Sequence, residues 1–550
     1  MKIQRIAGAA AFVAAGALVL SACAPGASDD NAAPATPGDI NASGVVRVNG
    51  SEPQNPLIPA NTMETGGGQV VNLIFSTLVN FEADGTPRNE VAESIETDDN
   101  IHWTITVEEG WTFSDGTPVL AENFVNAWDF AALASNVNQG AFLFEDIVGF
   151  DAENDVKLSE AGGLEVDADN DRVFHVTLNS AVSSFGIAIG HNAFSPLPDV
   201  AFEDMDAFGL NPIGNGPYQL VEWNHDQNIE LEVREGFNGW RVPQNGGIDF
   251  VFFADTQATY LALLGGDIDV ISFIPSQFIE TYRDELAGIG GFGSEPVPSA
   301  VWQGFWIPFW MEHFQAGEEG QLRRQAISMA IDRQEIVDAL FDGANTIAVD
   351  WTSPVIPGFS DSLEGNDVLT FNPDRAAELW AQADAISPFT GTFTLGVNAG
   401  GGHEEWAEAA TNQIANNLGI DTAVQSFPTF AVFLEETQSG EQNIAFRTGW
   451  QGQYPSIEYF LRPIYRTGAG SNSGQYTNPE FDAKLDAALQ ADSEDESIAN
   501  FQAAQEILLQ DLPTIPLWYG NARGGHGPNV DNVTFAWNTV PVFFEITVNN

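Results

Sequence analysis

The chain reads Leu322-Arg-Arg-Gln-Ala-Ile-Ser-Met-Ala-Ile-Asp-Arg333 at the point where its helix signals are clearest. Residues 322–331 predict one helix. Asp332 and Glu335 then form a capping box, in which each side chain bonds the other residue's backbone N–H, and Gly343 stands where a second helix would end. We therefore expect two helices in direct succession.

Strand signals lie on both sides of these helices. Residues 101–107 alternate apolar and polar side chains at period two, which is typical of a half-buried strand. Further strands are predicted at 173–178, 231–233, 248–253 and 392–397, and further helices at 374–383, 404–418 and 497–509. This mixture of strands and helices indicates an α/β architecture.

The charge balance is strongly acidic, with 77 Asp and Glu residues against 18 Lys and Arg. A field of this sign repels nucleic acid, so we expect no nucleic-acid partner. Because the acids are spread along the chain, the excess is typical of a solvated surface suited to salty surroundings. A preference for cationic ligands is the alternative interpretation.

The first residues resemble a lipoprotein signal. A basic start, Met1–Arg5, precedes the apolar run Ile6–Leu20, and Leu20-Ser-Ala-Cys23 resembles the lipobox of bacterial lipoproteins, whose cysteine carries a diacylglyceryl group. We predict a signal peptide at 1–22, lipidation of Cys23 and a flexible tether at 23–41. The protein would then be anchored at the extracytoplasmic face of the bacterial cell membrane. A plain signal peptide is the alternative.

Signals for catalysis, metals or cofactors fail on inspection. The run Gly288-Ile-Gly-Gly-Phe-Gly293 follows a helix-like segment rather than a strand, which predicts a loop and not a dinucleotide site. His403-Glu-Glu405 lacks the second histidine of a zincin, and no Gly-x-Ser-x-Gly elbow is present. Cys23 is the only cysteine, so no disulfide can form within the chain. We expect a protein without enzyme activity, metal or cofactor.

Six segments, taken in order, carry a resemblance to a known family. They are Asn72–Val79 followed by Asp84-Gly85, Gly110–Pro118, Asn211–Tyr218, Leu322–Arg333, Tyr476–Asp482 and Leu512–Pro516. Together they resemble the family 5 solute-binding proteins, which are the dipeptide- and oligopeptide-binding components of ABC importers. The resemblance covers nearly the whole chain after the predicted signal peptide.

The resemblance implies a periplasmic-binding-protein-like fold of two α/β lobes joined by a two-stranded hinge. Lobe I would comprise residues 42–84, 210–296 and 511–550, with an extra subdomain inserted at 85–209, and lobe II would comprise 297–510. Ligand would lie between lobes that close over it. The resemblance also implies an ABC permease and ATPase subunits as partners, and a monomeric binding protein.

The best-matched binding segment is Arg447-Thr-Gly449-Trp450-Gln451-Gly-Gln453-Tyr454. In oligopeptide binders this segment offers strand-like backbone to an extended peptide, and an aspartate at the position of Gln453 pairs with the peptide's ammonium. Gln453 keeps a hydrogen-bonding group but no charge.

The resemblance assigns three further residues to the same cleft. Arg447 and His403 match residues that meet peptide carboxylates, and Glu52 lies in a first-lobe strand that faces the cleft. The alternatives are a surface ion pair for Arg447 and a plain helix N-terminal residue for His403. Trp302, Trp306 and Trp310 are interpreted as core residues.

We therefore expect a peptide-binding lipoprotein of an ABC importer. One alternative is the same fold with another solute, such as an oligosaccharide, a nickel chelate or an opine, and the missing aspartate supports it. A secreted hydrolase and a purely adhesive or signalling lipoprotein are alternatives from other classes.

Overall fold

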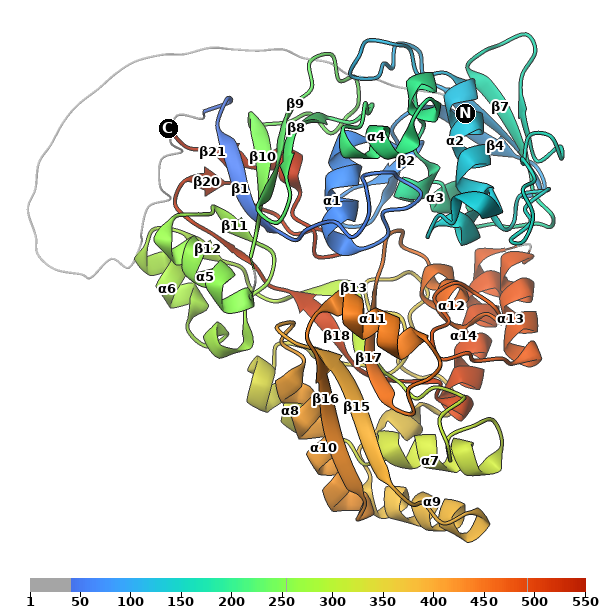
Figure 1. Cartoon of the computed structure of the whole chain (residues 1–550), viewed down its shortest axis with the longest axis vertical. Coiled ribbons are helices and arrows are strands. Elements are labelled where there is room, and N and C mark those ends of the chain that lie inside the picture. Colours follow the sequence, from blue (N-terminus) through green and yellow to red (C-terminus); the bar gives the residue numbers. More distant parts are fainter. Residues whose placement is uncertain (1–40, 254, 492) are drawn as a thin grey trace, which may run out of the picture. The chain divides into compact units, whose positions relative to one another are not determined.

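The computed structural model describes residues 41–253, 255–491 and 493–550, which form an α/β body with two large sheets and one smaller sheet (Figure 1). The predicted signal peptide, Cys23 and most of the tether lie outside the described residues. Within the described ranges, no helix has both the length and the apolar character that a membrane crossing requires.

The first large sheet has seven strands in the order β12-β19-β11-β1-β10-β9-β8. Its central strand β1 runs parallel to β10 and β11, whereas β10, β9 and β8 form an antiparallel meander. The strands are β1 (Val45–Gly50), β8 (Tyr218–Asn224), β9 (Asn228–Val233), β10 (Gly247–Phe252), β11 (Val270–Ile271), β12 (Phe292–Gly293) and β19 (Gly525–His526). The helices that accompany this sheet in sequence are α1 (Thr65–Ile74), α5 (Thr256–Gly265) and α6 (Tyr282–Gly288).

The second large sheet has six strands in the order β14-β18-β13-β17-β15-β16. They are β13 (Val297–Trp306), β14 (Thr346–Ile347), β15 (Thr392–Asn398), β16 (Asp421–Phe427), β17 (Ala445–Gln451) and β18 (Thr514–Ala522). The helices in this part of the chain are α7 (Glu318–Met329), α8 (Arg333–Phe341), α9 (Pro373–Ile386), α10 (Glu404–Leu418), α11 (Phe430–Gln438), α12 (Ile457–Tyr465), α13 (Pro479–Leu489) and α14 (Glu494–Asp511).

The smaller sheet is antiparallel, in the order β4-β5-β7-β6, and is accompanied by α2 (Ala121–Ala132). Its strands are β4 (Ala92–Thr97), β5 (His102–Val107), β6 (Leu164–Val166) and β7 (Val173–Thr177). Two strand pairs complete the architecture, β2 (Val79–Phe81) with β3 (Pro87–Asn89) and β20 (Val530–Asp531) with β21 (Thr547–Val548), together with the short helices α3 (Phe185–Ala188) and α4 (Met205–Leu210).

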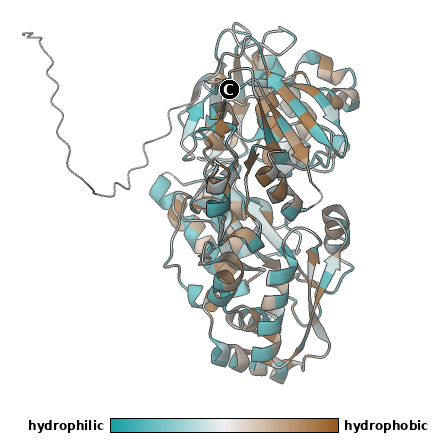
Figure 2. Ribbon diagram, turned by 90° about the vertical axis from the view of Figure 1, so that its left-hand side faces the viewer, coloured by the Kyte–Doolittle hydropathy of each residue, from teal (hydrophilic) through white to brown (hydrophobic). Residues whose placement is uncertain are grey.

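Burial follows the expected periodicities. In β5, Trp103, Ile105 and Val107 are buried and the residues between them are not, so the period-two prediction is confirmed. Figure 2 shows hydrophobic residues (brown) alternating with hydrophilic ones (teal) along strands and around helices. Buried side chains from all three sheets belong to one continuous core, and a smaller core lies around α5 and α6.

Most predicted helices are present, with differences at their ends. The Asp332 side chain accepts from the backbone N–H of Glu335 and caps α8, as predicted. The reciprocal half of the predicted capping box does not form, because the backbone N–H of Asp332 donates to Gln413 Oε1 at 2.8 Å. Helix α7 starts at Glu318, earlier than predicted, because Glu318 and Glu319 suit the positive end of a helix dipole. The glycine run 288–293, predicted as a loop, instead ends α6 and supplies β12.

The chain passes between the two large sheets on β13 and β18, which pair antiparallel with two register shifts. The arrangement is the expected two-lobe fold with a two-stranded connection and an inserted subdomain. Strand pairing places β18, residues 514–522, in the second sheet, whereas the predicted lobe I segment begins at 511. The lobe boundaries stay predictions.

Candidate functional site

A cavity of about 1060 Å³ is lined by residues from both lobes. The first lobe contributes the N-terminal turn of α1 and residues 272–274 before α6, and the second contributes β13, β17, α11 and the end of β18. Of the predicted ligand-binding residues, the cavity brings together His403, Arg447, Gly449, Trp450, Gln451 and Gln453.

Strand β17 presents a free backbone edge to this cavity. One edge pairs with β13 over residues 446–451, but the pairing with β15 on the other edge stops at Phe446. In the described part of the chain, no strand pairs with residues 447–451 on that second edge. Gly449, Trp450 and Gln451 all line the cavity although successive side chains point to opposite faces, so the cavity runs along the strand's edge.

Arg447 supplies a buried positive charge. Its Nε donates to Asn398 Oδ1 at 2.8 Å, and its guanidinium lies 4.8 Å from the ring centre of Phe430 and 5.2 Å from that of Phe433. Burial lowers the Arg447 pKa to about 10, which leaves the side chain charged at neutral pH. Among the described residues no carboxylate lies within 4.0 Å of Arg447, so the alternative of a surface ion pair is not supported.

His403 is held as a neutral imidazole. Burial, with a smaller contribution from the Arg447 charge, lowers its pKa to about 3. Its Nδ1 accepts from Trp406 Nε1 at 3.2 Å and lies 3.4 Å from Gln303 Nε2. Nδ1 therefore acts as an acceptor, which leaves the proton on Nε2, where it can be donated to an anion. His403 also occupies the N-cap position of α10, without a capping hydrogen bond.

Two glutamines, Gln451 at the end of β17 and Gln453 just after it, contact the first lobe. Thr65 Oγ1 donates to Gln451 Oε1 at 2.9 Å, and Gln451 Nε2 donates to Thr539 Oγ1 at 3.1 Å. Gln453 Nε2 lies 3.4 Å from the backbone oxygen of Met63. These contacts join the wall of the cavity across the two lobes.

The family model of the bacterial extracellular solute-binding proteins, family 5 (middle region), matches residues 86–472, well over half of the chain. The chain belongs to this family.

Relatives of this family 5 protein match it along most of its length. The oligopeptide-binding protein OppA of Bacillus subtilis (strain 168) is 25% identical over 518 residues, 91% of this chain and 92% of the relative. The murein tripeptide-binding protein MppA of Escherichia coli superposes with a TM-score of 0.79 at 21% identity, covering 92% of this chain and 98% of that one. Haemophilus influenzae OppA in complex with RPPGFSPFR gives 0.78 at 20% identity, covering 93% and 100%. The two solved structures support the two-lobe fold.

Two predicted site residues of this family 5 protein do not line the cavity. Glu52 accepts from His225 Nδ1 at 2.8 Å and from the backbone N–H of Asp226 at 2.9 Å, which turns it toward the β8–β9 turn. Tyr454 is 1% exposed and its hydroxyl donates to Glu458 at 3.2 Å. Strand β17 ends at Gln451, and the chain then turns and carries Tyr454 into the core.

Several lining residues had no local sequence signal. They include Glu64 at the start of α1, Glu435 and Gln438 on α11, Arg523 after β18, and the glutamines Gln69 and Gln303. Trp302 and Trp306, interpreted as core residues, are buried on β13, and Trp302 also borders the cavity. Within the described ranges no cluster of three His, Cys, Asp or Glu side chains is placed to hold a metal ion.

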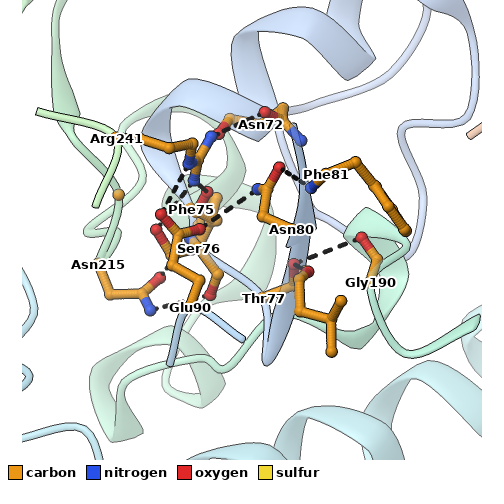
Figure 3. A network of polar contacts seen from close by, with 12 residues as sticks. Asn72, Phe75, Ser76, Thr77, Asn80, Phe81, Glu90, Gly190, Asn215 and Arg241 are labelled. Carbon is orange, nitrogen blue, oxygen red and sulfur yellow. Dashed lines mark hydrogen bonds and ion pairs between the residues drawn. The ribbon is translucent and has the colours of Figure 1, made fainter. Parts of the chain in front are cut away.

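A second cavity of about 480 Å³ adjoins the first and shares part of its wall, namely Glu64, Thr65, Gln69, Gln451 and Gln453. Arg241 and Asn72 lie in its far wall, within the polar network of Figure 3. Aromatic rings of Phe81, Trp240 and Trp537 complete this chamber.

Proposed function

We propose that this family 5 protein captures peptides in the larger cavity and delivers them to the permease and ATPase subunits of an ABC importer. The observation that carries the proposal is the free edge of β17 along residues 447–451. An extended peptide can add to such an edge as a further strand, so that main chain recognises main chain. Relatives with matching length bind oligopeptides, as their names state.

The charged groups of the cavity suit the two ends of a peptide differently. Among the residues that the structure describes, Arg447 is a buried cation without an acidic partner within 4.0 Å, and His403 can donate from Nε2. Both suit a carboxylate, because charge-assisted hydrogen bonds are stronger where water is excluded. We propose that they hold the ligand's carboxyl end or an acidic side chain.

A thermal-shift panel of peptides, oligosaccharides and metal chelates tests this function. A ligand that binds only the folded state adds about 2.7 kcal/mol to the unfolding free energy at a hundredfold excess over Kd. We expect peptides to raise the melting temperature, to remain uncleaved, and to reduce the radius of gyration as the lobes close. A response to sugars or chelates alone would contradict the proposal.

A neutral, non-peptide solute is the second candidate, because amide side chains dominate the polar lining. Gln54, Gln69, Gln303, Gln438, Gln451 and Gln453 all border the cavity, together with indole rings of Trp302 and Trp450. Amides both donate and accept, and aromatic faces pack against sugar rings. The same panel separates this candidate from peptides.

We further propose that the protein acts as a monomer, anchored to the outer face of the cell membrane through a diacylglyceryl group on Cys23. The lipobox-like sequence supports the anchor. Cys23→Ser should release the protein into the medium, and its retention in the membrane fraction would contradict the anchor.

A further inference from the structure

Glu64 places a carboxylate in the cavity wall next to Gln453, and within the described ranges this carboxylate has no basic partner within 4.0 Å. We propose that Glu64 binds the positively charged amino group of a bound peptide, in place of the carboxylate that position 453 lacks. This inference rests on the proposed peptide function and assigns the amine end of the ligand to the first lobe.

The Glu64 carboxylate is fixed by its own helix. Glu64 is the N-cap residue of α1, and its Oε2 accepts from the backbone N–H of Gly67 at 2.7 Å. Its Oε1 accepts from the backbone N–H of Gln54 at 3.0 Å. Each carboxylate oxygen has a second lone pair, so both oxygens can accept one more hydrogen bond from an ammonium group.

No basic group neutralises this carboxylate in the described structure. Among the described residues, no Lys, Arg or His nitrogen lies within 4.0 Å of the Glu64 carboxylate, whereas Glu82, Glu90 and Glu458 each form an ion pair. Burial raises the pKa of the Glu64 carboxyl, while the N–H groups of Gln54 and Gly67 act in the opposite direction. A half-buried carboxylate held by two backbone donors is prepared for a cationic ligand group.

Glu64 lies close to position 453, where the family resemblance places the amino group of the peptide. The Gln453 amide reaches the backbone oxygen of Met63, the residue directly before Glu64, and both side chains border both cavities. The cations of the larger cavity, Arg447 and Arg523, would repel an ammonium group. The other lining carboxylate, Glu435, is exposed on α11 and more strongly screened by solvent.

Calorimetry with oligoalanine peptides, each in free-amine and N-acetylated form, tests the assignment. Glu64→Gln keeps a capping acceptor but removes the charge. We expect this variant to raise the Kd of free-amine peptides about tenfold or more and to change the Kd of acetylated peptides less than about twofold. Glu64→Gln combined with Gln453→Asp should recover much of the loss for free-amine peptides only.

Two matched variants serve as controls. Asp332→Asn alters another acidic N-cap, on α8 and outside the cavity, and should change neither peptide form. Glu435→Gln should have little effect on the difference in affinity between free-amine and acetylated peptides. A loss of affinity for free-amine peptides alone in this variant would place the amine site at α11.

Equal loss of both forms in Glu64→Gln would overturn the assignment and reduce Glu64 to a helix cap. If wild type binds no oligoalanine peptide in either form while sugars or chelates bind, the peptide function itself fails and the inference fails with it. Binding of both forms with equal affinity by wild type would overturn the inference alone.

Discussion

At the scale of single residues, the buried ion pair of Arg241 and Glu90 borders the smaller cavity. Arg241 is 2% exposed and Glu90 is 0% exposed, with Arg241 Nε 2.8 Å from Glu90 Oε1. The remaining Arg241 donors bond Asn72, Phe75 and Ser76, so the guanidinium is fully satisfied (Figure 3). This network joins the loop between β9 and β10 to α1 and the residues that follow it, and supports the wall of the smaller cavity.

Glu90→Gln should destabilise the protein by about 3–5 kcal/mol, because it leaves the Arg241 cation buried without a counter-charge. Denaturant unfolding of both proteins measures the change. The exposed pair Arg88–Glu82, at 3.5 Å, offers a matched control, and Glu82→Gln should cost no more than about 1 kcal/mol. Similar costs for the two variants would mean that water reaches the Arg241 site.

At the scale of elements, the free edge of β17 is the feature that bears on binding. Its partner strand β13 holds residues 446–451 in register on one side, with Gln303 opposite Gly449. Along an antiparallel or parallel edge, the N–H and C=O groups that face a new strand belong to alternate residues. A peptide on this edge must therefore show a period of two in its backbone bonds.

A scan of N-methylated peptides should reveal this period. Methylation removes a donor, and at positions that face β17 the loss of one bond costs about 1 kcal/mol, or roughly fivefold in Kd. Methyl groups at the intervening positions should have much smaller effects. Isothermal calorimetry across the series measures the pattern, and uniform sensitivity or none would argue against strand addition at β17.

At the scale of the whole molecule, partly buried charges join α12 to residues 145 and 146, which lie in the segment 85–209 that is predicted as an inserted subdomain. Arg462 Nη2 lies 2.7 Å from Glu145 Oε1 and also donates to Asp146 Oδ1 at 2.7 Å. Arg462 Nη1 lies 3.4 Å from Glu458, whose other oxygen accepts from Ser184 at 2.9 Å. One cation thus holds three carboxylates from both parts of the molecule.

Arg462→Gln should lower the unfolding free energy by about 3–5 kcal/mol, because three carboxylates would lose their shared cation. It should also weaken peptide binding, since closure is favoured by every contact made only in the closed state. Calorimetry and chemical unfolding report the two effects separately. Lower stability with an unchanged Kd would place Arg462 and Asp146 in a unit that does not move on closure.

Local sequence was sufficient for most individual elements. Helix α10 has the predicted bounds Glu404–Leu418, and the Asp332 cap of α8 is present. Caps, helical periodicity and strand alternation are contacts between near neighbours, so they are written in contiguous residues. The predicted helix 497–509 is too short, because α14 already begins at Glu494. The acidic residues 494–496 form its first turn, and acidic residues are favourable at a helix N-terminus.

The composition of the cavity, in contrast, depends on long-range packing. Thr65 and Gln451 are 386 positions apart and meet only because β13 and β18 carry the chain between the two sheets. Family motifs marked the Arg447–Gln453 segment, but the end of β17 at Gln451 set which of its side chains reach the cavity. The sequence around Glu64 does not predict that Gln453 is its neighbour. The periodicity of apolar residues predicts which face of a helix or strand is buried, but only the tertiary fold decides which residues pack against that face.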